Sequence, residues 1–322
     1  MPSRRSLLSY LAAPVLAGGF MSRVSAAAPT PEFVGNDAWL NTGRPLTLAG
    51  LRGRVVLVEF GTYTCINWRR TLPYVNRWYA DYSPQGLQVI TVHTPEFEFE
   101  RNRPYVETAI RELRVRNPLA QDNAFQTWRA FGNRAWPSFY LLDREGKVRL
   151  VREGEGHARE LEAGIRSLLG LPRDPREPAT GDADLSGIRT PEMYFGSVHP
   201  TPQDPAQAPR QGEASYAIAR AGGPRLNEYQ LEGTWARDGE PLLLRSPRGL
   251  ARVRFSAAKL HLVAGSPQPA PVRVTVDGGP PRSFEIGMPT LYTLLDGDRY
   301  GEHLLELEST TPGFALFSAT FG

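Results

Sequence analysis

Residues Val55 to Leu72, with the sequence VVLVEFGTYTCINWRRTL, decide the fold of this chain. The short β-branched run Val55–Val58 is typical of a strand buried on both faces, and residues Gly61–Thr64 interrupt it. Cys65 then begins a pattern of apolar residues at helical spacing. A cysteine at this point lies among unpaired backbone N–H groups at the positive end of the helix dipole, which favours the thiolate. The stretch therefore predicts a strand, a turn, and a helix that begins at a reactive cysteine.

This stretch resembles the active-site segment of the thioredoxin-like superfamily, in which a strand carrying an acidic residue leads to a Cys-x-x-Cys pair. Glu59, six residues before Cys65, matches the buried acidic residue of that family. Trp68 stands where the second, resolving cysteine belongs, and Cys65 is the only cysteine of the chain. No disulfide can therefore form within one molecule, which excludes dithiol–disulfide cycling by this chain alone.

Composition places the chain among globular proteins of ordinary charge. Its 322 residues, 41% of them hydrophobic and 22% charged, suggest one large or two ordinary domains. The net charge is +3, and no basic stripe is interleaved with aromatic residues, so we expect no nucleic-acid partner. One cysteine excludes a disulfide framework, and the five histidines lack metal-ligand spacing. We therefore expect no metal and no other cofactor.

Residues 1–28 have the pattern of an export signal, with Arg4-Arg5 followed by an interrupted apolar run and small residues before Pro29. The segment Ser3–Leu8 resembles a twin-arginine signal; a general secretory signal or a membrane anchor are the alternatives. A transmembrane helix needs about 20 continuous apolar residues. We expect an exported protein, periplasmic or otherwise extracytoplasmic, without a membrane span in the mature chain.

From residue 29 to residue 170 the chain alternates strand and helix patterns, as an α/β domain does. The ordered segments TYTCINW, VHTPEFEFE, FQTWRAFGNRAWP and LLDREGKV resemble the redoxin domain of TlpA-like and DipZ-like exported proteins. This resemblance implies a thioredoxin-like fold. The expected elements are a hairpin at 39–48, strands at 55–58 and 87–93, helices from Cys65 and at 100–116, 122–131 and 158–169, and a hairpin turn at 143–147.

The same resemblance implies a substrate groove opposite the cysteine. Pro137, preceded by Trp136, matches the family's cis-proline, whose neighbouring backbone would pair with an extended peptide. We take Trp68, Trp136 and Pro137 as candidate substrate-binding residues. Core packing is the alternative for Trp68.

Cys65, Thr62 and Glu59 are the candidate catalytic residues. The Thr62-x-x-Cys65 spacing resembles the peroxiredoxin pattern, in which a threonine hydroxyl hydrogen-bonds the thiolate and a peroxide. Glu59 on a buried strand should have a raised pKa. Each has a structural alternative. Cys65 could be a buried, unreactive thiol, Thr62 a hydroxyl that only stabilises the turn, and Glu59 a structural carboxyl.

Residues 171–209 are rich in proline and predict a linker, in which Thr190–Gly196 is the one aromatic patch and a candidate docking segment. Residues 210–322 contain short β-rich runs separated by turns such as Gly278-Gly279 and Asp296-Gly297, typical of an all-β sandwich or jelly roll. In the last run Ala315, Phe317, Ala319 and Phe321 alternate, as in a half-buried strand.

The segments EGTWA, HLVAGSP, VRVTVDGGPP and LYTLL resemble the C-terminal domain of DipZ-like proteins, which is similar to a carbohydrate-binding module. A glycan is therefore a candidate ligand, stacked on Tyr229, Trp235, Tyr292 or Tyr300, with core packing as the alternative. DipZ-like chains usually carry an N-terminal electron-transporting membrane domain where this chain has the predicted signal. We therefore expect an external electron donor.

Two hypotheses follow, from different functional classes. In the first, the protein is a monothiol oxidoreductase or peroxidase-like enzyme, in which Cys65 attacks a disulfide or a peroxide and an external thiol or partner protein regenerates it. In the second, it is a redox-inactive binding protein that recognises a peptide, a partner protein or a glycan. A role in cytochrome c biogenesis is implied by the resemblance alone.

Overall fold

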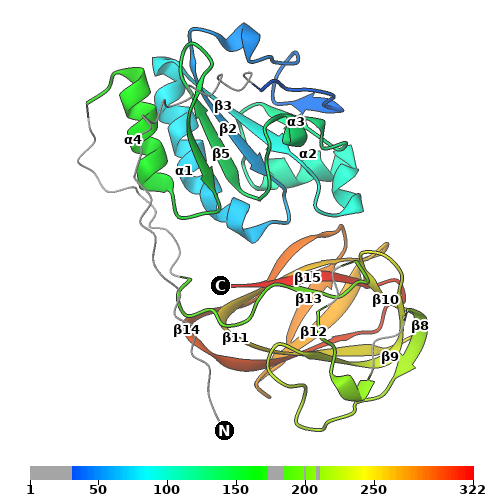
Figure 1. Cartoon of the computed structure of the whole chain (residues 1–322). Coiled ribbons are helices and arrows are strands. Elements are labelled where there is room, and N and C mark those ends of the chain that lie inside the picture. Colours follow the sequence, from blue (N-terminus) through cyan, green and yellow to red (C-terminus); the bar gives the residue numbers. More distant parts are fainter. Residues whose placement is uncertain (1–30, 173–184, 199–200, 208–210) are drawn as a thin grey trace, which may run out of the picture. The chain divides into compact units, whose positions relative to one another are not determined.

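The computed structural model describes residues 31–172, 185–198, 201–207 and 211–322 (Figure 1). The predicted export signal lies outside the described residues, as does part of the predicted linker. Residues 31–322 form one compact unit with two sheets. We call residues 31–172 the α/β region and the described residues from 185 onward the β region.

The α/β region is built on a six-stranded sheet in the order β1-β4-β3-β2-β5-β6. Its centre is β2 (Val55–Gly61), every residue of which is buried, as predicted. It pairs in parallel with β3 (Leu87–His93) and antiparallel with β5 (Ser138–Leu142). The hairpin from β5 to β6 (Val148–Glu153) confirms the predicted turn.

Helices cover both faces of this sheet, because β2 presents apolar side chains to both sides. Val55 and Leu57 pack with α1 (Ile66–Tyr82) and α4 (Ala158–Leu169), while Phe60 packs on the opposite face with Phe131, which follows α3 (Gln126–Ala130) (Figure 1). Helix α2 (Arg103–Glu112) packs against the first turns of α1. The thioredoxin-like α/β fold is thereby confirmed.

Three local predictions were wrong. The hairpin at 39–48 does not form, because β1 (Ala38–Leu40) pairs instead with β4 (Leu119–Gln121), a strand too short to show a period. The predicted helix at 100–116 is a short 3-10 turn (Glu98–Arg101) followed by α2, whose N-terminus is capped by Asn102. The helix predicted from Asp122 begins only at Gln126, since the Asp122 carboxyl accepts hydrogen bonds from the first backbone N–H groups.

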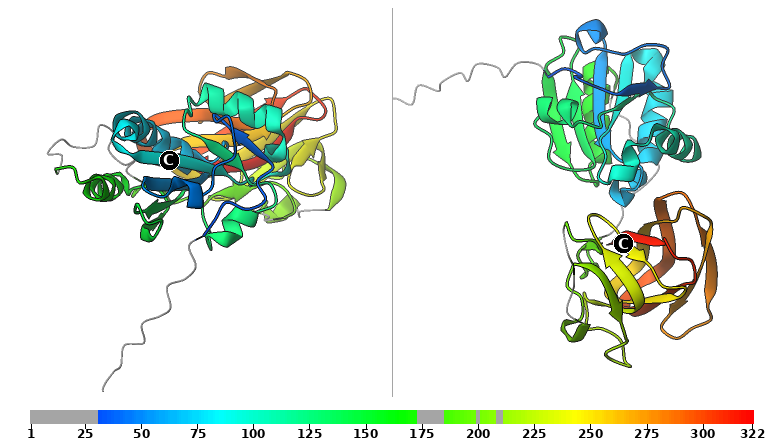
Figure 2. Two further views of the ribbon diagram at one scale, coloured as in Figure 1. Left: turned by 90° about the horizontal axis from the view of Figure 1, so that it is seen from above. Right: turned by 90° about the vertical axis from the view of Figure 1, so that its right-hand side faces the viewer.

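The β region is one nine-stranded sheet that folds over its own core, and Figure 2 shows its two layers. The long strand β11 (Gly249–Gly265) pairs with β9 (Tyr229–Arg237) along its first half and with β15 (Ala315–Phe321) along its second. The change occurs near a bulge between Ala257 and Lys259. The predicted all-β sandwich is confirmed. Its other strands are β7 (Met193–Tyr194), β8 (Gly212–Tyr216), β10 (Leu242–Leu244), β12 (Ala270–Val276), β13 (Arg282–Ile286) and β14 (Thr290–Ser309).

Two details of the β region differ from the prediction. Asp296-Gly297 lies inside β14 opposite the β11 bulge, so it is not a hairpin turn. Strand β15 is buried on both faces rather than half-buried, because Phe317 packs against the α/β region. The candidate docking segment does become part of the sheet: β7 pairs with β15. The domain boundaries themselves remain predictions.

No helix within the described residues has the length and apolar character needed to cross a membrane.

Candidate functional site around Cys65

Cys65 lies at the N-terminus of α1, where the sequence predicted it. It is the N-cap residue: its carbonyl oxygen accepts a hydrogen bond from the Arg69 N–H, and its own N–H donates to the Thr62 carbonyl. Its Sγ lies 3.9 Å from the carbonyl oxygen of Trp136, and the Trp136–Pro137 bond is cis. The structure therefore brings Cys65 together with Trp136 and Pro137. This is the arrangement of cysteine and cis-proline that the resemblance implied.

Trp68 fills the place of a resolving cysteine and packs beneath the thiol turn. Its side chain is fully buried, and a Cβ on Gly61 would overlap its indole, so a glycine is needed there. Glu59 is also fully buried, and burial raises the pKa of this carboxyl to about 7, as expected. The Thr91 hydroxyl donates to Glu59 at 2.5 Å, and together with the Trp68 side chain it lowers that pKa in part.

Thr62 is turned into the interior of the α/β region. Its hydroxyl lies 3.3 Å from His93 Nε2, and both side chains are fully buried. Burial lowers the pKa of His93 to about 3, so this imidazole is neutral at physiological pH. The hydrogen bond to a neutral imidazole supports the alternative in which the Thr62 hydroxyl stabilises the turn.

Glu100, which the sequence analysis did not single out, organises the turn before Cys65. Its buried carboxyl accepts hydrogen bonds from the Thr64 hydroxyl at 2.6 Å and from the backbone N–H groups of Thr64, Glu96 and Phe97 at 3.3, 2.6 and 3.0 Å. Burial raises its pKa. The helical pattern of residues 100–116 indicated only that Glu100 is a polar position at the start of a helix. Nothing in the sequence indicated that its hydrogen-bond donors, Thr64, Glu96 and Phe97, come before it in the chain.

The β region contacts the turn that carries Cys65. The Tyr63 hydroxyl donates to the Pro289 carbonyl at 3.2 Å, and Arg69 donates to the Thr290 hydroxyl at 2.9 Å. Phe97 and Phe99 stack on each other and meet Phe317 edge-on, with ring centroids 5.4 and 4.7 Å from it. The turn that carries the thiol therefore lies at a contact between the two regions.

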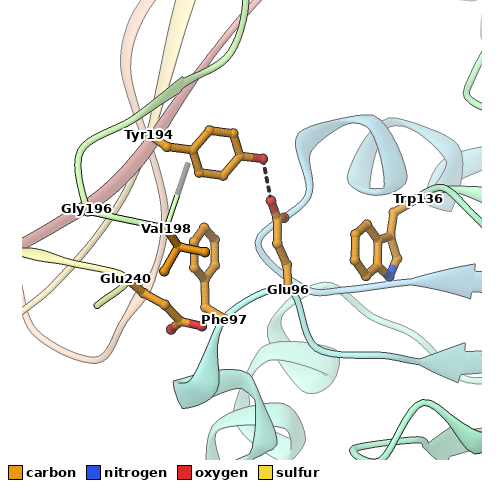
Figure 3. A pocket seen from close by; sticks show the side chains of 7 residues that line it. All are labelled: Glu96, Phe97, Trp136, Tyr194, Gly196, Val198 and Glu240. Carbon is orange, nitrogen blue, oxygen red and sulfur yellow. Dashed lines mark hydrogen bonds between the residues drawn. The ribbon is translucent and has the colours of Figure 1, made fainter. Parts of the chain in front are cut away.

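A group of carboxyl side chains belongs to the same contact. The Tyr194 hydroxyl donates to Glu96 Oε1 at 2.7 Å (Figure 3). Glu192 accepts a hydrogen bond from the Thr320 hydroxyl at 2.8 Å. Burial and the charge of Glu192 raise the pKa of Glu96, and burial also raises that of Glu192. Glu240 accepts a hydrogen bond from the Glu98 N–H at 2.8 Å.

The predicted lowering of the Cys65 pKa is wrong for this arrangement. Burial raises the pKa of the thiol to about 12, and the negative charges of Glu96 and Glu192 add to the rise. The backbone N–H groups of Trp68 and Asn67 do lower it, as the helix N-terminus predicts, but burial dominates. Cys65 is therefore a protonated thiol at neutral pH in this arrangement.

The aromatic residues considered for sugar stacking divide into two kinds. Tyr229 and Trp235 are buried in the core of the β region, so the core-packing alternative is correct for them. Tyr292 is partly buried against that core, and Tyr300 is 38% exposed. Within the described residues, no group of three or more His, Cys, Asp or Glu side chains is placed to hold a metal ion.

Comparisons with known proteins agree with this division into two regions. Residues 26–151 match the AhpC/TSA family, and residues 190–322 match the family described as the thioredoxin like C-terminal domain. Protein DipZ of Mycobacterium tuberculosis is 33% identical over 312 residues, 94% of this chain and 44% of DipZ. The chain thus spans less than half of that relative's length.

Shorter relatives match less than half of this chain. The thiol-disulfide oxidoreductase YkuV of Bacillus subtilis is 28% identical over 142 residues, which are 44% of this chain and 94% of YkuV. The crystal structure of a thiol-disulfide isomerase from Corynebacterium glutamicum is 23% identical with a TM-score of 0.39, over 44% of this chain and 97% of that one.

Proposed function

Because this chain joins a thioredoxin-like domain of the AhpC/TSA family to a thioredoxin-like C-terminal domain and is a homologue of DipZ, we propose that it is a monothiol redox protein acting on disulfides. The placement of Cys65 carries the proposal: the thiol begins α1 and lies 3.9 Å from the Trp136 carbonyl beside a cis Trp136–Pro137 bond. An extended peptide paired with this backbone would bring its sulfur to Cys65.

The chemistry is thiol–disulfide exchange in two steps. The Cys65 thiol loses its proton to solvent, and the thiolate attacks one sulfur of a substrate disulfide. A bond forms between Cys65 and that sulfur while the substrate bond breaks and releases the other sulfur as a thiolate. An external thiol then attacks the mixed disulfide, frees Cys65 and leaves disulfide-bonded to the substrate sulfur.

The first step requires the thiolate of Cys65, which burial and the charge of Glu192 in the β region disfavour. A thiol with a pKa of about 12 is almost fully protonated at neutral pH, and the thiolate is the nucleophile. We therefore propose that the β region must separate from the Cys65 turn before exchange begins. Disulfides are preferred to peroxides as substrates, because the Thr62 hydroxyl is engaged by His93.

The experiment is a pH series of Cys65 alkylation by iodoacetamide in the full chain, followed by reaction with 2-hydroxyethyl disulfide. We expect slow alkylation at pH 7, and a mixed disulfide on Cys65 that glutathione removes. Mass spectrometry detects both the alkylated protein and the mixed disulfide, and Cys65→Ser is the control. A thiol that forms no mixed disulfide at any pH up to 9 contradicts the proposal. Dimedone trapping after mild peroxide treatment tests the peroxide alternative separately.

A binding protein without redox activity is the second candidate. The buried Trp68 and the raised pKa of the thiol favour it, since neither suits a nucleophile at neutral pH. In that case the groove beside Pro137 would hold a peptide without a covalent step. An unreactive Cys65 together with peptide binding to both wild type and Cys65→Ser would establish it.

We also propose that the protein acts outside the cytoplasm, with a disulfide-containing partner protein and an external electron donor. The export-signal pattern of residues 1–28 and the DipZ homology support this. Cleavage after export is tested by N-terminal sequencing of protein from the periplasmic fraction. A glycan ligand and a part in cytochrome c biogenesis remain predictions.

A further inference from the structure

A cavity of about 220 Å³ lies beside Trp136. Trp136, Phe97 and Tyr194 form aromatic parts of its wall, and Glu96 and Glu240 supply its charged groups (Figure 3). Pockets for drug-sized molecules have volumes of about 300–1,000 Å³, so this one suits a single small group or one side chain.

The residues that line this cavity include carboxyl side chains and no basic residue. Glu96 and Glu240 line it, and Glu192 raises the pKa of Glu96 by its charge. None of the three forms an ion pair within the described part of the chain. Burial and the nearby charge of Glu192 raise the pKa of Glu96 and favour its protonated form, and a cation bound beside this carboxyl would favour the ionised form instead.

Glu96 has one oxygen available for such a ligand. Its Oε1 accepts the Tyr194 hydroxyl at 2.7 Å, while its Oε2 has no hydrogen-bond partner among the described residues. Figure 3 shows this carboxyl between the Tyr194 and Trp136 rings. Aromatic faces attract organic cations through the ring quadrupole. Metal ions such as Mg²⁺ need several oxygen ligands and water, which the aromatic wall does not supply.

We propose that this cavity is a binding site for an organic cation, an ammonium or guanidinium group, held by Glu96 and Glu240 against the rings of Trp136 and Tyr194. The group belongs either to a lysine or arginine side chain of a bound peptide or to a small amine. This site is distinct from the thiol chemistry, since it does not require Cys65 to react.

Calorimetric titration of the Cys65→Ser protein tests the site without any redox step. The probes are agmatine, for a small amine, and N-acetyl-arginine methylamide, for a peptide side chain. Citrulline methylamide with the same acetyl group is the neutral control for the latter. We expect saturable binding of at least one cationic probe, and no binding of the citrulline compound. Tighter binding of the arginine compound assigns the site to peptides, and tighter binding of agmatine assigns it to small amines.

Variants then locate the bound probe. Glu96→Gln and Glu240→Gln should each weaken binding about tenfold or more, since each removes a carboxyl group that can ionise and pair with the bound cation. Glu98→Gln is the matched control: it lies on the same loop, its carboxylate is 76% exposed, and it should change affinity less than twofold. Thermal melting checks that each variant folds. Absence of binding by both cationic probes, equal binding of the citrulline compound, or equal effects of Glu98→Gln and Glu96→Gln would overturn the proposal.

Discussion

Glu96 and Glu100 are four residues apart on one loop, yet their surroundings differ completely. Glu100 is fully buried and accepts four hydrogen bonds, all from Thr64, Glu96 and Phe97 in the α/β region. Glu96 accepts one, from Tyr194 of the β region, and lies near a second carboxyl, that of Glu192.

The difference separates structure from function in this loop. A buried carboxyl surrounded by donors stabilises the fold, because it satisfies groups that would otherwise be unpaired. A carboxyl facing other carboxyls stabilises nothing by itself and depends on protonation, on a distant region of the chain or on a ligand. We therefore assign Glu100 to the support of the Cys65 turn and Glu96 to recognition.

Replacing Glu100 should produce the largest effect. Glu100→Ala leaves the Thr64 hydroxyl and three backbone N–H groups without their acceptor, and each buried unsatisfied group costs about 1–3 kcal/mol. We expect the free energy of unfolding of the α/β region to fall by about 3 kcal/mol or more, measured by urea denaturation with tryptophan fluorescence.

Glu107→Ala is the control for this variant. Glu107 forms an exposed pair with Arg103 on α2, and such i,i+4 pairs contribute about 0.3–0.5 kcal/mol. Similar losses of stability in the two variants would show that Glu100 is not a supporting residue.

The contrast also shows how far the sequence predicts this molecule. Strand 87–93 and helix 158–169 were predicted with correct boundaries because their periods extend over two or more turns or pleats. The meeting of Cys65 with Trp136 and Pro137 was expected as well, although only through family resemblance. Long periodic runs therefore predicted the fold, and the ordered motifs of the family predicted the position of the turn that carries Cys65.

The rest depends on contacts between distant residues. Tyr194 and Glu96 are 98 residues apart, and no local pattern pairs them. The raised pKa of Cys65 comes mainly from burial, and the charge of Glu192 in the β region adds to it, so a helix-dipole argument gave the wrong direction. Strands β4 and β10 were missed because three residues are too few to display a period.

Phe317→Ala should weaken the contact between the two regions and expose Cys65. Phe317 packs against Phe97 and Phe99, and loss of a buried Phe side chain costs about 3–5 kcal/mol. As the thiol becomes solvated its pKa should fall toward the free-cysteine value of about 8.5. We expect the alkylation rate of Cys65 at pH 8 to rise about tenfold or more.

Phe284→Ala is the matched control, since this ring packs partly on the β-region core and lies on β13. It should destabilise the β region without changing the alkylation rate in the folded protein. Equal acceleration in the two variants would mean that general loosening, and not the Phe317 contact, exposes the thiol.

Glu96→Gln should alter the pH dependence of stability, the smallest of these effects. Burial and the charge of Glu192 raise the pKa of Glu96 from 4.5 to about 8, so the folded protein holds a proton that the unfolded chain releases. Stability should therefore be highest below pH 4.5 for this group and fall as the pH rises toward 8.

His93 and His261 change stability in the opposite direction below pH 6.5, because burial lowers their pKa values. Since both histidines remain in the variant, the difference between wild type and Glu96→Gln isolates the Glu96–Glu192 pair. We expect the midpoint of thermal unfolding to fall from pH 5.5 to pH 8 by a few degrees less in Glu96→Gln, about 1–2 kcal/mol of stability. Identical pH profiles would mean that Glu96 is not destabilised by its surroundings, and the contrast with Glu100 would lose its electrostatic basis.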